Sequence, residues 1–236
     1  NSTGGLLSFN HLGVLSSDGK RLVVPDRFNN RVLIWNSSPS GNSPPDLVLG
    51  QKDFNSNNPG NGLDQMNWPV SVSVSSDGKV AVTDTMNFRI LLWKSFPTKN
   101  GQSADIVLSG RDGPGPNKKE IVWPWGVWTD GQKLAVASTR GSTVLIWNSF
   151  PAQNDQQPDI YLTAKGQFGT PRTITSDGKR LIVSDHNAKV PPDKGPSQGG
   201  NPNRGGPASP AGGQGGLMEG EATFFWKNWP ATNDAP

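Results

Sequence analysis

The stretch SSDGKVAVTDTMNFRILLWKSFP at residues 75–97 decides the fold, because the chain contains it several times with small changes. Related stretches are SSDGKRLVVPDRFNNRVLIWNSSP at 16–39 and TDGQKLAVASTRGSTVLIWNSFP at 129–151. A partial copy, SDGKRLIVSDHNAK, occupies 176–189. Repetition at a nearly fixed period is typical of folds in which one supersecondary unit is stacked on its own copies.

Each unit follows the same order of turns and apolar runs. Asp-Gly turns recur at spacings of 59, 53 and 47 residues, and after each of the first three a Trp closes an apolar run 16 or 17 residues after the Asp. In the second unit we expect four strands: VSVSV (70–74), KVAVTD (79–84), RILLW (89–93) and DIVL (105–108). The first alternates strictly, whereas RILLW is nearly all apolar, as expected for a strand covered on both faces.

Four short strands in roughly 50 residues predict a β-propeller blade. The sequence therefore indicates an all-β fold, a β-propeller of four-stranded antiparallel blades. A β-sandwich is the alternative, but it has no reason to repeat one sequence at one period. We expect a single domain over 1–236, with one repeat in each of four ranges: 9–50, 68–110, 123–165 and 170–236.

Composition agrees with this fold and narrows the function. Gly (29) and Pro (21) are abundant among 236 residues, and hydrophobic residues make up 32%, which fits many short strands and polar loops. The net charge of +3 is not concentrated in a basic patch, so we expect no nucleic-acid partner. No apolar stretch is long enough to span a membrane as a helix. The lack of cysteine favours an extracytoplasmic location.

The stretches VPDRFNNRVLIW and VTDTMNFRILLW resemble the NHL repeat, whose pattern is hydrophobic-Asp-x-x-Asn-x-Arg-hydrophobic after a Gly turn. The third unit departs from this pattern, and the fourth begins well but breaks after Lys189. The resemblance implies a propeller fold. It implies no single function, since NHL propellers include scaffolds, ligand binders and a few enzymes.

Two features interrupt the repeat. A Gly- and Pro-rich insertion is predicted over 190–221, and the missing Trp-ended strand then follows as ATFFW at 222–226. By the spacing of the earlier units, the next strand would begin at 237 or 238, beyond Pro236. Two explanations stay open: residues 1–8 complete the last blade and close a four-bladed ring, or the chain is part of a larger propeller. An open sheet edge would be a site of association.

The acidic residues that end the second strand of each unit are the candidate metal ligands. Asp26, Asp84 and Asp185, with the neighbouring His186, would lie round one axis and could hold a cation such as Ca²⁺. The alternative is structural, because Asp commonly accepts N–H bonds in turns. No catalytic triad, phosphate loop or thiol nucleophile occurs, so we predict no catalytic residue and no required cofactor.

Tryptophans outside the repeated strand position are candidates for contact with a partner or a glycan. Trp125 lies in the dense stretch VWPWGVW (122–128) and has no counterpart in other units, while Trp128 and Trp229 are further candidates.

These observations favour a non-catalytic binding or assembly scaffold that presents loops on a rigid propeller. Two alternatives remain: a metal-dependent lyase or lactonase, and a structural subunit of a homopolymer or larger complex. We expect a protein partner or self-association, with a glycan as the alternative ligand.

Overall fold

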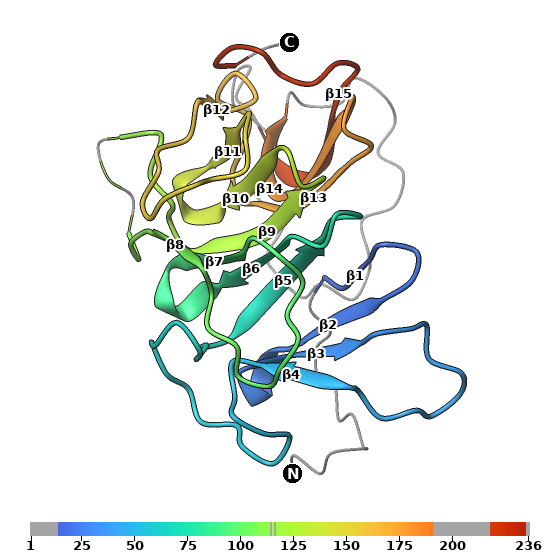
Figure 1. The fold of residues 1–236 in the computed structure, drawn as a ribbon. Helices are drawn as coiled ribbons and strands as arrows, with labels where there is room; N and C mark the ends of the chain where they lie inside the picture. The colour runs from blue at the N-terminus through green and yellow to red at the C-terminus, as the bar shows by residue number, and fades with distance from the viewer. Residues whose placement is uncertain (1–13, 114, 116, 191–217, 235–236) are drawn as a thin grey trace, which may run out of the picture.

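The computed structural model describes residues 14–113, 115, 117–190 and 218–234 of the chain. Along these residues four separate antiparallel sheets follow one another, and each keeps its strands in chain order. Figure 1 shows the sheets arranged as successive blades from the blue to the red end of the chain. The predicted all-β fold of a β-propeller is confirmed.

The sheets fall within the four predicted repeats. Blade 1 contains β1 (Ser16–Ser17), β2 (Leu22–Asp26), β3 (Arg31–Trp35) and β4 (Leu47–Leu49). Blade 2 contains β5 (Pro69–Val74), β6 (Val80–Asp84), β7 (Arg89–Trp93) and β8 (Ile106–Ser109). Blade 3 contains β9 (Pro124–Thr129), β10 (Leu134–Ser138), β11 (Thr143–Trp147) and β12 (Ile160–Leu162). Blade 4 contains β13 (Pro171–Ser176), β14 (Leu181–Val190) and β15 (Met218–Trp226).

Two kinds of turn set the strand register within a blade. The Asp-Gly turn joins the first and second strands, and its glycine has a φ of +83° to +92° in all four blades, a conformation that other residues rarely adopt. In blades 1 to 3 a single 3₁₀ turn joins the second and third strands, for example η2 (Thr85–Asn87) in blade 2. The predicted Asp-Gly hairpins are therefore confirmed.

The apolar third strands form the cores between blades. All five residues of β3 and of β11 are buried, as their nearly continuous apolar sequence predicted, and the burial includes Arg31 and Thr143 at the start of each strand. The repeated tryptophans are buried as well: Trp35, Trp93, Trp147 and Trp226. Three apolar clusters each combine side chains of two successive blades, so every blade face that meets a neighbour is covered by it. Neither face of such a sheet could be shielded by one blade alone.

A second contact, the asparagine latch, joins neighbouring blades at their rim. Asn100, Asn154 and Asn233 each lie seven residues after the repeated Trp, in the loop that leaves the third strand. Each Oδ1 accepts the N–H of the second residue in the outer strand of the preceding blade, at 3.0 Å in all three cases. The following residue has a positive φ and donates its own N–H to the carbonyl of that same outer-strand residue.

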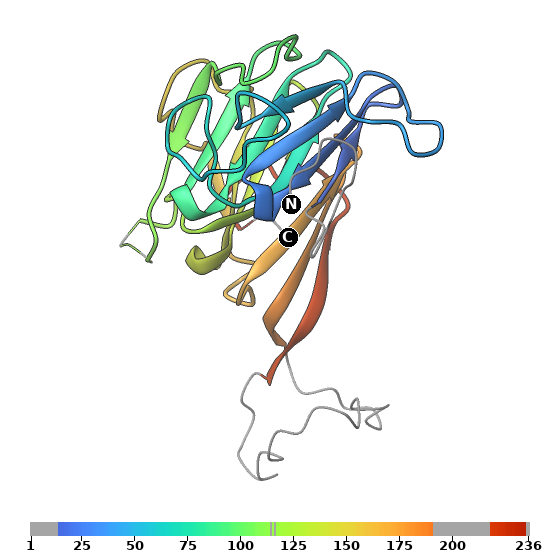
Figure 2. The same cartoon turned by 90° about the horizontal axis from the view of Figure 1, so that it is seen from below.

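Blade 4 differs from the other three. Among the described residues it has three strands, and β14 and β15 are longer than their counterparts, so their hairpin extends away from the other blades (Figure 2). The insertion predicted over 190–221 is shorter at both ends, because Val190 ends β14 and Met218 begins β15. The segment 1–8, considered for ring closure, and residues 191–217 lie outside the described residues. No helix within the described part could cross a membrane.

Candidate binding site

The acids predicted to bind a metal instead accept hydrogen bonds from their own blade. Asp84 is fully buried, and its carboxylate accepts the N–H of Asn67 at 2.6 Å, the amide of Asn87 at 2.8 Å and the Nε of Arg89 at 2.7 Å. Burial raises the pKa of the Asp84 carboxyl, while these three donors oppose the rise. The carboxylate thus fixes the turn and the chain leading into the first strand of its blade.

Blades 1 and 4 use the same position in related ways. Asp26 accepts the amide of Asn29 at 3.0 Å and the Nε of Arg31 at 2.8 Å. Asp185 accepts three backbone N–H groups at 2.9 Å, from Gly169, Thr170 and Asn187.

Blade 3 has Ser138 at this position. Its Oγ accepts the N–H of Val122 and donates to the carbonyl of Glu120, both at 2.8 Å. Asp84 in blade 2, Ser138 in blade 3 and Asp185 in blade 4 therefore all anchor backbone N–H groups, whereas the hydrogen bonds of Asp26 within the described residues come from side chains.

The candidate metal ligands do not converge. Within the described part of the chain, no group of three or more His, Cys, Asp or Glu side chains could hold a metal ion. His186 is exposed, and its Nε2 lies 3.9 Å from a carboxylate oxygen of Glu221, which belongs to β15. His186 and Asp185 line one pocket together, whereas Asp26 and Asp84 belong to other blades.

Equivalent cross-strand pairs reveal a surface that distinguishes blade 4. The face of each blade directed at the next one is here called the forward face. Cross-strand pairs of the second and third strands lie on it, and one of them is compared first. These pairs are Val23–Ile34, Ala81–Leu92, Ala135–Ile146 and Ile182–Phe225. The first three pairs are completely buried between blades, whereas Phe225 is 51% exposed and Ile182 is half-buried.

The forward face of blade 4 is also more polar and contains two pockets. Ser184 and Thr223 form its next pair, where blade 3 has Ala137 and Val144. A pocket of about 390 Å³ lies against Ser184, Thr223 and His186, and a second of about 300 Å³ lies against Ile182 and Phe225. This surface therefore combines an apolar centre with hydroxyl and imidazole groups.

His186 lies at the sequence position whose side chain joins neighbouring blades in blades 2 and 3. In blades 2 and 3 the residue after the second strand is a threonine whose hydroxyl donates to a proline carbonyl of the next blade. Thr85 donates to Pro124 at 2.8 Å, and Thr139 donates to Pro171 at 2.6 Å. His186 follows Asp185 in the sequence as these threonines follow Asp84 and Ser138, but it lies within β14 and its imidazole is exposed.

Trp125, predicted as an exposed contact residue, is half-buried among aromatic and arginine side chains. Its ring lies 6.2 Å from Trp68 and 5.0 Å from Trp123, measured between ring centroids. The guanidinium of Arg172 lies 4.6 Å from the Trp125 centroid, and that of Arg27 lies 5.9 Å from it. We call Arg27, Trp68, Trp125 and Arg172 the arginine–tryptophan cluster.

Trp128 and Trp229 lie elsewhere and contact each other. Their ring centroids are 5.2 Å apart, and both side chains are half-buried against the core between blades 3 and 4. The Nζ of Lys133 lies 4.8 Å from the Trp229 ring. Of the three predicted contact tryptophans, Trp125 therefore belongs to the arginine–tryptophan cluster, and Trp128 and Trp229 form a separate pair.

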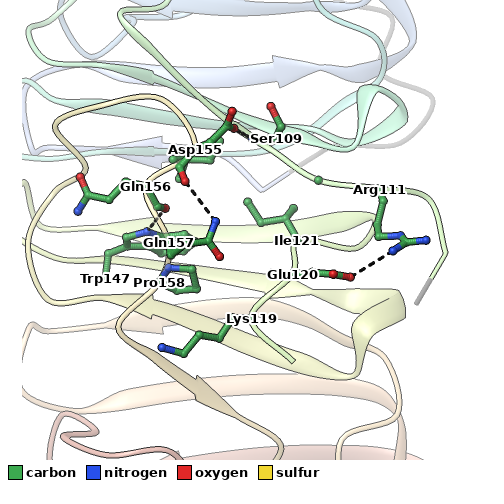
Figure 3. Close-up of a pocket in the computed structure, with 12 residues that line it drawn as sticks. Ser109, Arg111, Lys119, Glu120, Ile121, Trp147, Asp155, Gln156, Gln157 and Pro158 are labelled. Atoms are coloured by element: carbon green, nitrogen blue, oxygen red, sulfur yellow. Dashed lines mark hydrogen bonds and ion pairs between the residues drawn. The ribbon is translucent and has the colours of Figure 1, made fainter. Parts of the chain in front are cut away.

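A further pocket of about 230 Å³ lies at the joint between blades 2 and 3 (Figure 3). Asp155, which follows a latch asparagine, accepts the N–H of Ser109 at 2.7 Å, and Trp147 donates to the carbonyl of Gln156 at 2.8 Å. Glu120 lies 3.5 Å from Arg111. The polar groups of Asp155, Trp147 and Glu120 in this pocket are therefore already engaged in contacts within the protein.

The comparisons with known proteins identify a fold and no family. No protein-family model and no curated protein matches the sequence. The fold is similar to hydrazine synthase from Kuenenia stuttgartiensis, with a TM-score of 0.52 and 13% identity over 77% of this chain and 45% of that chain. The PQQ-bound aldose sugar dehydrogenase from Streptomyces coelicolor has a TM-score of 0.44 and 12% identity, over 92% and 63% of the two chains.

A structure of the Chaetomium thermophilum Polycomb Repressive Complex 2 bound to GSK126 gives a TM-score of 0.46 and 12% identity, over 73% and 38% of the two chains. This chain spans less than half the length of the hydrazine synthase chain that it matches. Identities at this level show the fold alone. The class of protein is accordingly a β-propeller.

Two features were missed by the sequence analysis. The latch asparagines are visible as a recurring Asn seven residues after the repeated Trp, a signal that an alignment of the units could have revealed. The forward face of blade 4 had a weaker signal: Phe225 and Thr223 stand where other units have Ile, Leu or Val.

Proposed function

We propose that this chain is an NHL-type β-propeller that acts outside the cytoplasm as a non-catalytic assembly scaffold, docking a second copy of itself on the forward face of blade 4. The NHL assignment is supported by the Asp-x-x-Asn-x-Arg contacts of blades 1 and 2, where Asp84 accepts from both Asn87 and Arg89. The extracytoplasmic location is supported by the lack of cysteine.

One observation carries the docking proposal: the Ile182–Phe225 pair is exposed at the place where three equivalent pairs are buried by a neighbouring blade. A blade face that stays in contact with solvent is expected to carry polar side chains. Here an aromatic side chain lies among Ser, Thr and His groups, an arrangement typical of protein interfaces with an apolar centre and a polar rim.

The contacts between blades inside the chain show the chemistry that a second copy would use on this surface. The hydroxyls of Ser184 and Thr223, 3.5 Å apart, and the imidazole of His186 supply donors and acceptors for a neighbouring backbone. The contact would repeat the chemistry by which Thr139 binds the carbonyl of Pro171 inside the chain.

Sedimentation velocity over about 1 to 100 μM protein tests the proposal. We expect concentration-dependent dimers for the unchanged chain and loss of dimers in Phe225→Arg. Leu63→Arg is the matched control, since Leu63 is 42% exposed but lies in the loop before blade 2. A monomer at every concentration, or equal loss of dimers in both variants, would contradict the proposal.

A further inference from the structure

Arg27 and Arg172 differ from the other arginines in the described residues, because neither forms an ion pair with a described carboxylate. The others all do: Arg21 with Asp18, Arg31 with Asp26, Arg89 with Asp84, Arg111 with Glu120, Arg140 with Asp112 and Arg180 with Asp177. The two exceptions come from blades 1 and 4, yet both contact the ring of Trp125 in blade 3.

Both exceptional side chains also have an unsatisfied donor. The Nε atoms of Arg27 and Arg172 are buried and have no hydrogen-bond partner among the residues that the structure describes. Arg27 as a whole is only 8% exposed and lies 4.5 Å from the Trp68 ring and 5.0 Å from the Phe28 ring. A buried guanidinium is normally paired with an anion and fully hydrogen-bonded, so these groups have the charge and the donors to accept one.

Contact with an indole ring does not by itself explain why Arg27 and Arg172 have no carboxylate partner among the described residues. Arg140 lies 4.6 Å from the Trp123 ring, the same distance as Arg172 from Trp125, and it also forms an ion pair with Asp112. In this protein a stacked arginine therefore retains the capacity to bind a carboxylate. The indole orients the planar guanidinium, and the edge of that plane remains available for two parallel hydrogen bonds to an oxyanion.

A ligand can reach the cluster from the forward face of blade 4. Arg172 lines the pocket of about 390 Å³, together with His186 and Glu221. Asp185 lines it as well, but its oxygens already accept backbone N–H groups. Glu221 is exposed and lies close to His186, so its charge faces the imidazole.

We propose that Arg172 and Arg27, oriented by Trp125, form a binding site for the oxyanion of a small ligand, a carboxylate or a phosphate. The site shares its pocket with the docking surface proposed above, because Ser184, Thr223 and His186 also line that pocket. Binding of an anion needs no second protein chain, so the two proposals are tested separately. Arg172 contacts the ligand from the pocket, and Arg27 supplies the second positive charge from the buried side.

Titration of the full chain with inorganic phosphate and with glucuronate tests the site, using tryptophan fluorescence and calorimetry, with glucose as the uncharged control. We expect binding of at least one anion, no binding of glucose, and about a tenfold or greater loss of affinity in Arg172→Gln. Binding of phosphate alone would indicate a phosphate-bearing ligand, and binding of glucuronate alone would indicate an acidic sugar.

Arg140→Gln is the matched control, because it removes a stacked arginine that already has a partner. Its affinity for the anion should equal that of the unchanged chain, and Arg172→Lys should retain part of the binding. Thermal unfolding of each variant verifies that it is folded. No binding of either anion, or equal loss in Arg140→Gln and Arg172→Gln, would overturn the proposal.

Discussion

The side-chain Oδ1 of Asn154 accepts the backbone N–H of Val107 at 3.0 Å, across the boundary between blade 3 and blade 2. Asn100 and Asn233 make the same contact with the outer strands of blades 1 and 3. The acceptor is a side chain of one blade, and the donor is a backbone N–H of the preceding blade. Each bond therefore fixes the position of two sheets relative to each other.

Replacement of a latch asparagine should weaken the joint between two blades. Asn154→Ala leaves the N–H of Val107 without its protein acceptor, and we expect the free energy of unfolding to fall by about 1 kcal/mol. Urea unfolding followed by tryptophan fluorescence measures this change. Gln153→Ala alters the adjacent exposed residue and serves as control; equal stability of the two variants would refute the role of the latch.

The buried Asp84–Arg89 pair should be strongly coupled. Asp84→Ser leaves the Arg89 guanidinium partly unpaired, and we expect a loss of about 3 kcal/mol in the free energy of unfolding. The double variant Asp84→Ser with Arg89→Thr introduces the residue types that blade 3 has at Ser138 and Thr143. Because the unpaired charge is then absent, the double variant should lose less than the sum of the single variants.

Chemical denaturation of all three variants measures this coupling. Additive losses within error would mean that Asp84 acts only on the backbone of its blade.

Stability should fall in acid through the carboxylate of Asp177 in the Asp-Gly turn of blade 4. The N–H of Arg180, then its guanidinium and the N–H of Lys179, hold the pKa of Asp177 well below its ordinary value. A carboxyl whose pKa is lowered by folding stabilises the protein above its ordinary pKa, and this contribution disappears as the pH falls.

Thermal midpoints from about pH 6 to about pH 3 should therefore drop more steeply in the unchanged chain than in Asp177→Asn. Identical slopes would show that Asp177 adds nothing to the pH dependence.

Calcium should leave the thermal midpoint unchanged. The carboxylates of Asp26, Asp84 and Asp185 belong to different blades and already accept donors from their own blades. A ligand that binds only the folded state would raise the midpoint, and a tighter ligand would raise it further at the same concentration. Thermal scans with excess Ca²⁺ and with a chelator make the comparison, and a clear rise with Ca²⁺ would support the axial cation hypothesis instead.

The sequence predicted the architecture well because the architecture depends on local patterns. Asp-Gly pairs select positive-φ hairpins, and RILLW-type runs select strands that are buried on both faces. The structural alternative for Asp84 could also be foreseen, since its partners Asn87 and Arg89 lie three and five residues away.

The candidate sites depended on distant residues and could not be predicted in this way. Arg27 and Arg172 lie far apart in the chain, and only the folded structure brings both to Trp125. The exposure of Phe225 likewise depends on which blade covers its face, which is a property of the assembly of repeats and not of the FFW sequence itself.

Hydrogen–deuterium exchange at low and high protein concentration tests the docking surface most directly, because it reports the location of the contact as well as its existence. We predict slower exchange at high concentration in peptides from β13, β14 and β15, and unchanged exchange in peptides from β6 and β10, whose forward faces are already covered. Exchange in blade 4 that is the same at both concentrations, in a chain shown to be folded, would contradict the account.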